Sequence, residues 1–472
     1  MASPGGVIDR EPLARYLAGV FRSRVEILAL QPLKGGIDGG LDPKGFGYGV
    51  PFEVGCVIDG TPRSFVVSRT RPAKRFARAI LDGGPFDLAM LPSMFRGGLM
   101  SKPMSWAIWI TGLPGSGKSV LARGAAAELE ALGKRVVVLE LDEIRKFLTP
   151  APTYSETERD LVYRALVSMA RALVLAGVSV IVDATAHRRV WRDLARASIE
   201  RFAEVQLECP IEVCRERERD RREGNAPRGI YAQAGRLGAA VPGVDVPYEP
   251  TLAPELAIDT AAKDVSTAIR RIVGLALALA HDGIEDRPDP SARWAIWITG
   301  LPGSGKTTIA RSVADALAAR GVPVKVLELA EMRRPLLGEQ PESDYALEIV
   351  HRALAYTAKL LTEAGVAVIV DATAPRRAWR ELARDLIARF AEVQLRCPRE
   401  ICLERERAVR WHLAEHATAP HAAHAIAEAP DLVFGYEHSL RPELTLYTDV
   451  QGLCSAVEEV LRLANCLFVD SS

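Results

Sequence analysis

The chain has 472 residues, of which 60 are Lys or Arg and 60 are Asp or Glu, and 48% are hydrophobic. This length predicts roughly three domains. The balanced charge argues against wholesale binding to nucleic acid or to a membrane surface. Seven cysteines without a Cys-x-x-Cys spacing predict neither a zinc site nor a dithiol redox site.

Two further features favour a cytoplasmic protein. The N-terminus lacks the basic-then-apolar pattern of a secretion signal. The longest apolar stretch, Ile272–Ala280, is too short to cross a bilayer. We therefore expect a protein with small-molecule substrates and no membrane or nucleic-acid partner.

Residues 1–100 predict a small α+β module. Three stretches, Val25–Leu30, Phe52–Ile58 and Arg63–Ser68, have the composition of strands and are separated by glycine-rich turns. This arrangement weakly resembles the small nucleotide-binding lobe of aminoglycoside-phosphotransferase-like kinases. The lysine that such a lobe carries on its third strand is missing, because Val66-Val-Ser-Arg69 stands there. We therefore expect a structural or interaction module.

From residue 104 the chain alternates apolar strands with helical patterns. The predicted strands are Ala107–Thr111, Arg135–Leu141, Ser179–Asp183 and Glu204–Glu208. The predicted helices are Ser119–Leu132, Glu156–Ala176 and Arg188–Arg201. Strand–helix alternation predicts a doubly wound parallel sheet, in which ligands bind beyond the carboxyl ends of the strands.

A phosphate-binding loop follows the first of these strands. Gly112-Leu-Pro-Gly-Ser-Gly-Lys-Ser119 matches G-x-x-x-x-G-K-[ST] between a strand and a helix. The glycines let backbone N–H groups point at phosphate oxygens, and the helix N-terminus adds partial positive charge. The predicted nucleotide-binding residues are Gly112, Pro114, Gly115, Ser116, Gly117, Lys118 and Ser119, with Lys118 on the β- and γ-phosphates and Ser119 on Mg²⁺.

Two aspartates are candidates for catalysis and metal binding. Asp183 ends an apolar strand, where a carboxylate can orient Mg²⁺, or where it can cap the next helix instead. Asp142 follows the second strand and could accept a proton from an acceptor hydroxyl or help place the metal. Lys118, Asp142 and Asp183 are therefore the predicted catalytic residues.

Several arginines could bind anionic groups. Arg145, Arg159 and Arg164 could hold an anionic acceptor, with solvated surface charges as the alternative reading. Arg217 is the best candidate in a basic run to close over ATP phosphates, although the interleaved Glu212, Glu216 and Glu218 equally permit a salt-bridged exposed helix.

The whole unit is repeated. Trp106–Lys118 returns as Trp294–Lys306 and Phe202–Leu207 as Phe390–Leu395, both at an offset of 188 positions. The polar, proline-bearing segment His281–Pro290 has the character of a linker. We therefore predict two tandem P-loop NTPase domains, at 104–280 and 292–468, after the module at 1–100.

The second copy keeps the phosphate loop and loses the acceptor side. Asp142 becomes Ala330, Arg159 becomes Leu347, and Arg228–Tyr231 becomes His416–Ala419. We expect this copy to be a degenerate kinase domain that can bind nucleotide without catalysis, and that could pack on the first copy as an intrachain pseudo-dimer; homo-oligomers are also open. Its predicted nucleotide-binding residues are Gly300, Gly303, Ser304, Gly305, Lys306 and Thr307.

The first copy resembles the adenylylsulfate (APS) kinases over almost all of 104–262. Besides the loop, the resemblance rests on Glu140–Arg145, Tyr154–Arg159, Arg228–Ala234 and Val244–Glu249. It implies transfer of the γ-phosphate of ATP, with Mg²⁺, to the 3′-hydroxyl of APS, giving PAPS and ADP. It also implies that Arg228 and Tyr231 contact substrate.

Departures from the family pattern leave the acceptor open. Val162 stands at the position of a family asparagine, Asp183-Ala-Thr-Ala186 replaces an Ile-Ser-Pro segment, and Val241 replaces a phenylalanine. A kinase for another small-molecule hydroxyl, such as a sugar, nucleoside or antibiotic, and a nucleotide-binding scaffold therefore remain alternatives.

Overall fold

A computed structural model describes most of the chain and contains three separate sheets. Residues 93–407 and 427–472 form one compact unit that holds both copies of the repeat, and the N-terminal strands belong to the other unit. The described residues are 25–32, 52–58, 61–67, 105–221, 229–236, 240–261, 264–280, 292–338, 342–415 and 435–469.

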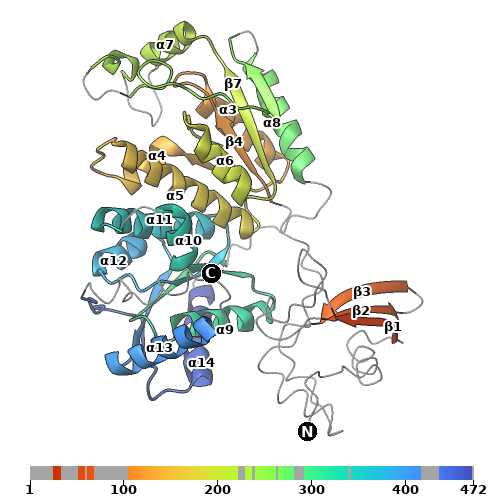
Figure 1. Cartoon of the computed structure of the whole chain (residues 1–472), viewed down its shortest axis with the longest axis vertical. Coiled ribbons are helices and arrows are strands. Elements are labelled where there is room, and N and C mark those ends of the chain that lie inside the picture. Colours follow the sequence, from red (N-terminus) through yellow and green to blue (C-terminus); the bar gives the residue numbers. More distant parts are fainter. Residues whose placement is uncertain are drawn as a thin grey trace. The chain divides into compact units, whose positions relative to one another are not determined.

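The N-terminal strands form a three-stranded antiparallel sheet. They are β1 (Val25–Pro32), β2 (Phe52–Ile58) and β3 (Thr61–Val67), paired in the order β1-β2-β3 (Figure 1). The register shifts between Ile27 and Ala29, as at a β-bulge. The three strands predicted from sequence are present: Phe52–Ile58 has the predicted bounds, and the ends of the other two differ by at most two residues.

The first copy contains a five-stranded parallel sheet in the order β5-β6-β4-β7-β8. Every residue of the central strand β4 is buried, as expected for a strand covered on both faces. The strands are β4 (Ala107–Thr111), β5 (Val136–Glu140), β6 (Ser179–Asp183), β7 (Phe202–Glu208) and β8 (Leu256–Asp259).

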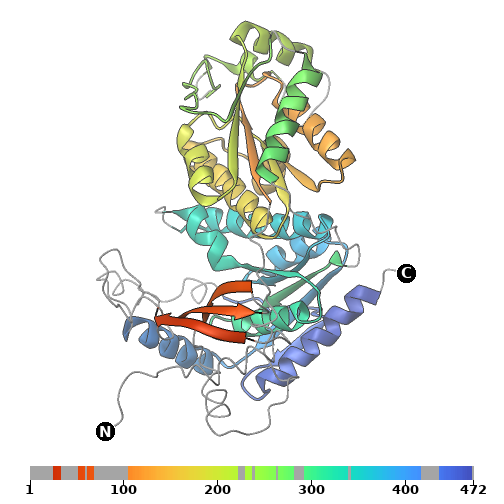
Figure 2. The same cartoon turned by 90° about the vertical axis from the view of Figure 1, so that its right-hand side faces the viewer.

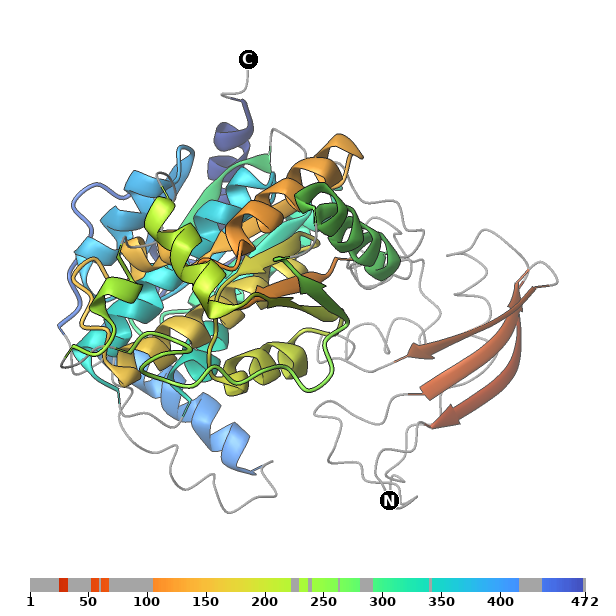
Figure 3. The ribbon, with the colours of Figure 1, turned by 90° about the horizontal axis from the view of Figure 1, so that it is seen from above.

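Helices cover both faces of this sheet, which confirms the doubly wound α/β class. Helices α3 and α8 lie side by side on one face, where Ile108 and Ile110 of β4 join their core (Figure 3). Ala107 and Trp109, which point to the opposite face, pack with α4, α5 and α6. The helices are α3 (Lys118–Ala131), α4 (Leu141–Leu148), α5 (Glu156–Leu175), α6 (Arg189–Ser198), α7 (Ile211–Asp220) and α8 (Val265–Ala280), with a short 3₁₀ helix at Tyr231–Gln233.

One predicted boundary was wrong in a way that matters for the site. The strand predicted at Arg135–Leu141 ends at Glu140, and Leu141 begins α4. Asp142 therefore lies in the first turn of a helix rather than in a strand-end loop. The apolar run gave no sign of this change because Leu141 is also buried.

The second copy repeats this architecture, with the order β10-β11-β9-β12-β13. Its strands are β9 (Ala295–Thr299), β10 (Val324–Glu328), β11 (Ala367–Asp371), β12 (Phe390–Arg396) and β13 (Leu444–Tyr447). Its helices are α9 (Lys306–Ala318), α10 (Leu329–Leu337), α11 (Asp344–Glu363), α12 (Arg377–Leu386), α13 (Arg399–Glu415) and α14 (Leu453–Val469). The predicted duplication of the domain is confirmed.

The two copies share one apolar core. Helix α5 contacts α10 and α11, and the buried residues of these three helices form a single cluster (Figures 1 and 2). Polar contacts border this apolar surface. Arg352 donates to the carbonyl oxygen of Phe147 at 3.2 Å, and Arg135 donates to that of Ala364.

A buried ion pair fastens α6 to β7 in the first copy. Arg192 Nε lies 2.6 Å from Glu204 Oε1, and the two side chains are 0% and 2% exposed. Arg192 also donates to the carbonyl oxygens of Ala186 and Glu249, so it ties the loop after β6 to the same point. The second copy has the same pair in Arg380 and Glu392, 2.7 Å apart.

No helix within the described ranges is both long enough and apolar enough to span a membrane.

The Glu204→Ala variant should unfold far more easily than the wild type. It leaves the Arg192 charge buried without its partner, which typically costs about 3–5 kcal/mol. Arg189→Ala, which removes an exposed pair with Asp193, is the control and should change the free energy of unfolding by less than about 0.5 kcal/mol. Urea unfolding measures both, and equal midpoints for the two variants would contradict this reading of the pair.

Candidate active site

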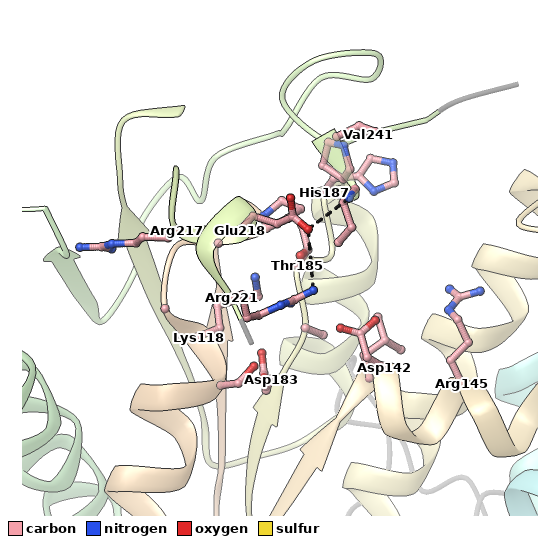
Figure 4. A pocket seen from close by; sticks show the side chains of 18 of the residues that line it. Lys118, Asp142, Arg145, Asp183, Thr185, His187, Arg217, Glu218, Arg221 and Val241 are labelled. Carbon is pink, nitrogen blue, oxygen red and sulfur yellow. Dashed lines mark hydrogen bonds and ion pairs between the residues drawn. The ribbon is translucent and has the colours of Figure 1, made fainter. Parts of the chain in front are cut away.

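Most of the residues predicted for the site of the first copy line one cleft of about 1230 Å³. Its lining includes Lys118, Ser119, Asp142, Arg145 and Asp183, which follow three different strands of the sheet (Figure 4). The cleft lies where the parallel strands end, as the doubly wound fold requires.

The phosphate loop has a backbone that only glycine tolerates at two positions. Gly117, which precedes α3, has φ 98°, and Gly115 has φ 81°. A Cβ on Gly115 would lie 2.3 Å from the carbonyl oxygen of Cys214, so a side chain there would collide with the backbone at the start of α7. The loop is thus curled tightly and pressed against α7.

The lysine of the loop is folded back on it. Lys118 Nζ donates to the carbonyl oxygens of Gly112 at 3.1 Å and Leu113 at 3.0 Å. Burial lowers the pKa of Lys118, while the neighbouring Asp183 and Asp142 act in the opposite direction. Among the described residues, the buried hydroxyl of Ser116 has no hydrogen-bond partner. The loop therefore offers donors that an anion could take over.

Two carboxylates lie near this lysine, with Asp183 beside the phosphate loop and Asp142 further along the cleft (Figure 4). Asp183 ends β6, and α6 begins only at Arg189 with Arg188 as its N-cap, so Asp183 does not cap that helix. Burial raises the pKa of Asp183 and of Asp142, and Lys118 partly opposes the rise in both. A buried acid with a raised pKa is a suitable proton acceptor near neutral pH.

The loop after β6 forms the floor of the cleft. Thr111 donates to the carbonyl oxygen of Thr185 at 2.6 Å, and Trp109 Nε1 donates to that of Ala184 at 3.1 Å. The Ala186 N–H donates to the hydroxyl of Tyr163 at 3.0 Å, and Ala186 has an unusual φ of 40°. These contacts hold Asp183-Ala-Thr-Ala186 in one conformation.

Of the three arginines predicted on the acceptor side, two line the cleft. Arg145 pairs with Glu158 at 3.1 Å, and Arg159 donates to the carbonyl oxygen of Ala240 at 3.2 Å. Arg164 does not line it. Its Nε binds Asp160 at 2.7 Å and its Nη1 donates to the carbonyl oxygen of Pro335 at 3.4 Å, so the expectation that it faces the cleft was wrong. The face of α5 on which Arg164 lies depends on how the helix packs, which the sequence does not show.

Two arginines near the end of α7 point in directions that the sequence did not predict. Arg217 borders the cleft, but its guanidinium turns away and donates to the carbonyl oxygen of Thr260 at 2.9 Å (Figure 4). Arg221 points into the cleft instead and lies 3.8 Å from Glu218 (Figure 4). Both arginines belong to the run of alternating charges near residues 215–222. The sequence alone did not show which of them points into the cleft.

Glu218 and Tyr231 connect the segment after α7 to the rest of the site. The buried Glu218 accepts from the N–H groups of Gly229 at 2.7 Å and Ile230 at 3.2 Å. The hydroxyl of Tyr231 donates to the carbonyl oxygen of Pro114 at 2.8 Å, so this side chain contacts the phosphate loop. Arg228 lies outside the described residues.

Two further residues of the cleft, His187 and Tyr163, are not among those predicted from sequence. His187 borders it and stands edge-on to Trp191, and burial lowers the pKa of His187 to about 4. Tyr163 also lines it and stacks on Trp191 with ring centroids 4.1 Å apart. Tyr163 supports the loop after β6 by accepting the hydrogen bond from the Ala186 N–H. No sequence signal indicates this contact.

The second copy has the same loop and a changed opposite wall. Lys306 donates to the carbonyl oxygens of Gly300 at 3.1 Å and Leu301 at 3.0 Å, and Thr307 lies 2.5 Å from Asp371. Gly303 has φ 79° and Gly305 φ 98°, while Ser304 is buried as Ser116 is. Ala330 is the second residue of α10, as Asp142 is of α4, and the buried Leu347 stands at the place of Arg159.

The family model for adenylylsulphate kinase matches twice, over residues 104–259 and 292–445. A probable adenylyl-sulfate kinase of Archaeoglobus fulgidus is 40% identical over 162 residues, which cover 34% of this chain and 99% of that protein. An adenylyl-sulfate kinase of Synechococcus sp. (strain JA-3-3Ab) is 37% identical over 164 residues, which cover 34% of this chain and 88% of that protein.

A solved structure of the Mycobacterium tuberculosis APS kinase, in complex with AMPPNP and APS, is 29% identical. It covers 37% of this chain and 98% of its own, with a TM-score of 0.33. The two matches to the family model together span more than half of the chain. The chain therefore belongs to the adenylylsulphate kinase family, as a P-loop kinase with two such domains in tandem.

Proposed function

We propose that the first copy transfers the γ-phosphate of ATP to the 3′-hydroxyl of adenylylsulfate, giving PAPS and ADP. The observation that carries this proposal is the placement of Lys118 and Asp142 on opposite walls of one cleft. Membership of the adenylylsulphate kinase family supports the choice of acceptor.

The nucleotide side is the phosphate loop. Its N–H groups, with Gly115 and Gly117 at positive φ, fit the oxygens of a triphosphate. Lys118 would exchange its two carbonyl partners for the β- and γ-phosphates. The repeated loop at Gly300–Thr307 has the same donors, so we also propose nucleotide binding by the second copy.

Ser119 and Asp183 fit a magnesium ion. A hydroxyl and a carboxylate that line the same cleft are oxygen ligands of the kind that Mg²⁺ accepts beside phosphate. When bound, the ion would neutralise charge on the phosphates during transfer.

Asp142 would prepare the acceptor. A carboxylate with a raised pKa can take the proton of the attacking hydroxyl, and that hydroxyl must lie within hydrogen-bond reach of it. Arg145 and Arg159 border the same part of the cleft and fit the anionic groups of adenylylsulfate. Arg228, which lies outside the described residues, stays a proposal from the resemblance alone.

Arg221 is better placed than Arg217 to stabilise the transferred phosphoryl group. Its guanidinium points into the cleft, where positive charge stabilises negative charge spread over the equatorial oxygens. Arg217 would still contribute by fixing α7 to the loop after β8, through Thr260.

One observation favours a different acceptor. The cleft-lining loop Asp183-Ala-Thr-Ala186 differs from the family's Ile-Ser-Pro segment, so another small-molecule hydroxyl is the second candidate. The second copy lacks an acid at Ala330, and we propose that it binds nucleotide without catalysing transfer. A scaffold without any turnover is the third possibility that the assays below separate.

ADP release should depend on adenylylsulfate. In a coupled assay over a panel of hydroxyl acceptors, we expect turnover with adenylylsulfate in the presence of Mg²⁺ and ATP. Release with another acceptor alone would favour the second candidate, and release with none would favour a scaffold.

The two loop lysines should differ in effect. Lys118→Ala should abolish turnover because it removes the positive charge that would contact the transferred phosphate. Lys306→Ala, the matched change in the second copy, should leave most of the turnover intact. Equal losses would show that the second copy takes part in catalysis.

The acid limb of the pH–rate profile should lie above the ordinary pKa of an aspartate. Because burial raises the pKa of Asp142, kcat should fall as the pH drops through that raised value, where the base becomes protonated. Asp142→Asn should lower kcat by about 10²- to 10⁴-fold while leaving ATP affinity close to wild type. A kcat near wild type in this variant would refute its role as the base.

Gly115→Ala should lose nucleotide binding. It combines backbone strain at φ 81° with a collision against the Cys214 carbonyl oxygen. Gly133→Ala is the matched control, since Gly133 has φ 76° but an added Cβ meets nothing within 4 Å. Binding of a fluorescent ATP analogue, with circular dichroism to check folding, measures the difference, and equal affinities for the two variants would count against the proposed cradle.

A further inference from the structure

A single buried carboxylate organises the acceptor wall of the cleft. Glu158, in the first turn of α5, has a fully buried side chain. It accepts hydrogen bonds from Thr153 N at 2.6 Å, Thr153 Oγ1 at 2.7 Å, Tyr154 N at 3.2 Å, Arg145 Nη1 at 3.1 Å and Tyr345 OH at 2.7 Å.

Three of the four residues that donate to Glu158 line the cleft. Thr153, Tyr154 and Arg145 all line it. Tyr154 has φ 54°, a conformation that is unusual for a residue other than glycine and that needs support from its surroundings. The Arg145 guanidinium lies 5.4 Å from the centre of the Tyr154 ring, so the two residues form one packed group.

The remaining donor comes from the second copy. Tyr345 is the second residue of α11, and its hydroxyl reaches the Oε2 atom of Glu158 beside the contact of α5 with α11. Although burial alone would raise the pKa of Glu158, the hydrogen bonds from Tyr345 and Thr153 hold that pKa below its usual range. The carboxylate is thus kept ionised opposite Arg145.

The reverse contact is missing. At the offset of 188, Glu158 corresponds to Ala346 and Tyr345 corresponds to Thr157, neither of which can reproduce the bond. Arg333, the counterpart of Arg145, pairs instead with Glu342 on its own copy. The support therefore runs in one direction, from the copy with an altered acceptor wall into the copy with an intact one.

We infer that Tyr345 of the second copy is a positioning residue for the acceptor side of the first, acting through Glu158 on Arg145 and on the backbone of Thr153 and Tyr154. The inference rests on the proposed function only in assigning this wall to the acceptor. It gives the second copy a role that requires no catalysis by it.

The test is Tyr345→Phe, which removes the hydroxyl and keeps the ring. Loss of a hydrogen bond to a charged group corresponds to roughly a tenfold effect. We expect the KM for the acceptor to rise about threefold to tenfold, with the KM for ATP and kcat nearly unchanged.

Tyr356→Phe is the matched control. Its hydroxyl also crosses between the copies, to Glu143 at 3.4 Å, but Glu143 does not line the cleft. This variant should leave both KM values at wild-type levels. An equal rise of the acceptor KM in the two variants would mean that either change simply weakens the packing between the two copies. That result would overturn the inference.

A double-variant cycle tests the route through Glu158. Glu158→Gln alone should raise the acceptor KM, and adding Tyr345→Phe to it should have little further effect because both changes act on one contact. Fully additive effects would show that Tyr345 does not act through Glu158.

Amide hydrogen exchange gives a readout that does not depend on the acceptor. The N–H groups of Thr153 and Tyr154, which donate to Glu158, should exchange faster in Tyr345→Phe and at the wild-type rate in Tyr356→Phe. Unchanged exchange in Tyr345→Phe overturns the inference. If the wild type shows no turnover with adenylylsulfate, the proposed function fails by itself, and the exchange rates still decide this inference.

Discussion

The closest constraint in the first copy is a contact of backbone with backbone. Gly115 of the phosphate loop lies so near the Cys214 carbonyl oxygen that a Cβ on it would be 2.3 Å away, and a Cβ on Gly303 would be 2.2 Å from the Cys402 carbonyl oxygen in the second copy. The loop that would hold phosphates is thus pressed against the start of α7. Because Glu218 lies on α7 and Arg221 directly follows this helix, the position of the loop and that of the arginine facing the cleft are linked through α7.

The two copies act as an internal comparison between what the fold needs and what the site needs. The buried pair Arg192–Glu204 reappears as Arg380–Glu392 at nearly the same distance, because either charge alone would be costly to bury. Asp142, by contrast, is replaced by Ala330 at the start of the corresponding helix without any change in strand order. The scaffold therefore tolerates loss of the acceptor wall, and resemblance of the fold alone does not establish activity of the second copy.

Sequence reasoning reached the fold and the nucleotide side of the site but only part of the acceptor side. The strands, the duplication and the glycine loop are local patterns, set by apolar runs and by positions where only glycine fits, so they can be recognised without tertiary structure. The direction in which an arginine points depends on helix limits and packing. Arg164, expected in the cleft, reaches Pro335 of the other copy, while Arg221 faces the cleft and Arg217 does not.

Glu158 shows the most difficult kind of residue to find from sequence. It lies in a stretch of alternating polar residues that is typical of an exposed first turn, yet its side chain is completely buried. What buries it is a loop of its own copy and Tyr345, 187 positions away along the chain. The hydrogen bonds to Glu158 thus include one donor that the first copy does not supply, so the second copy contributes to this network without any catalysis of its own.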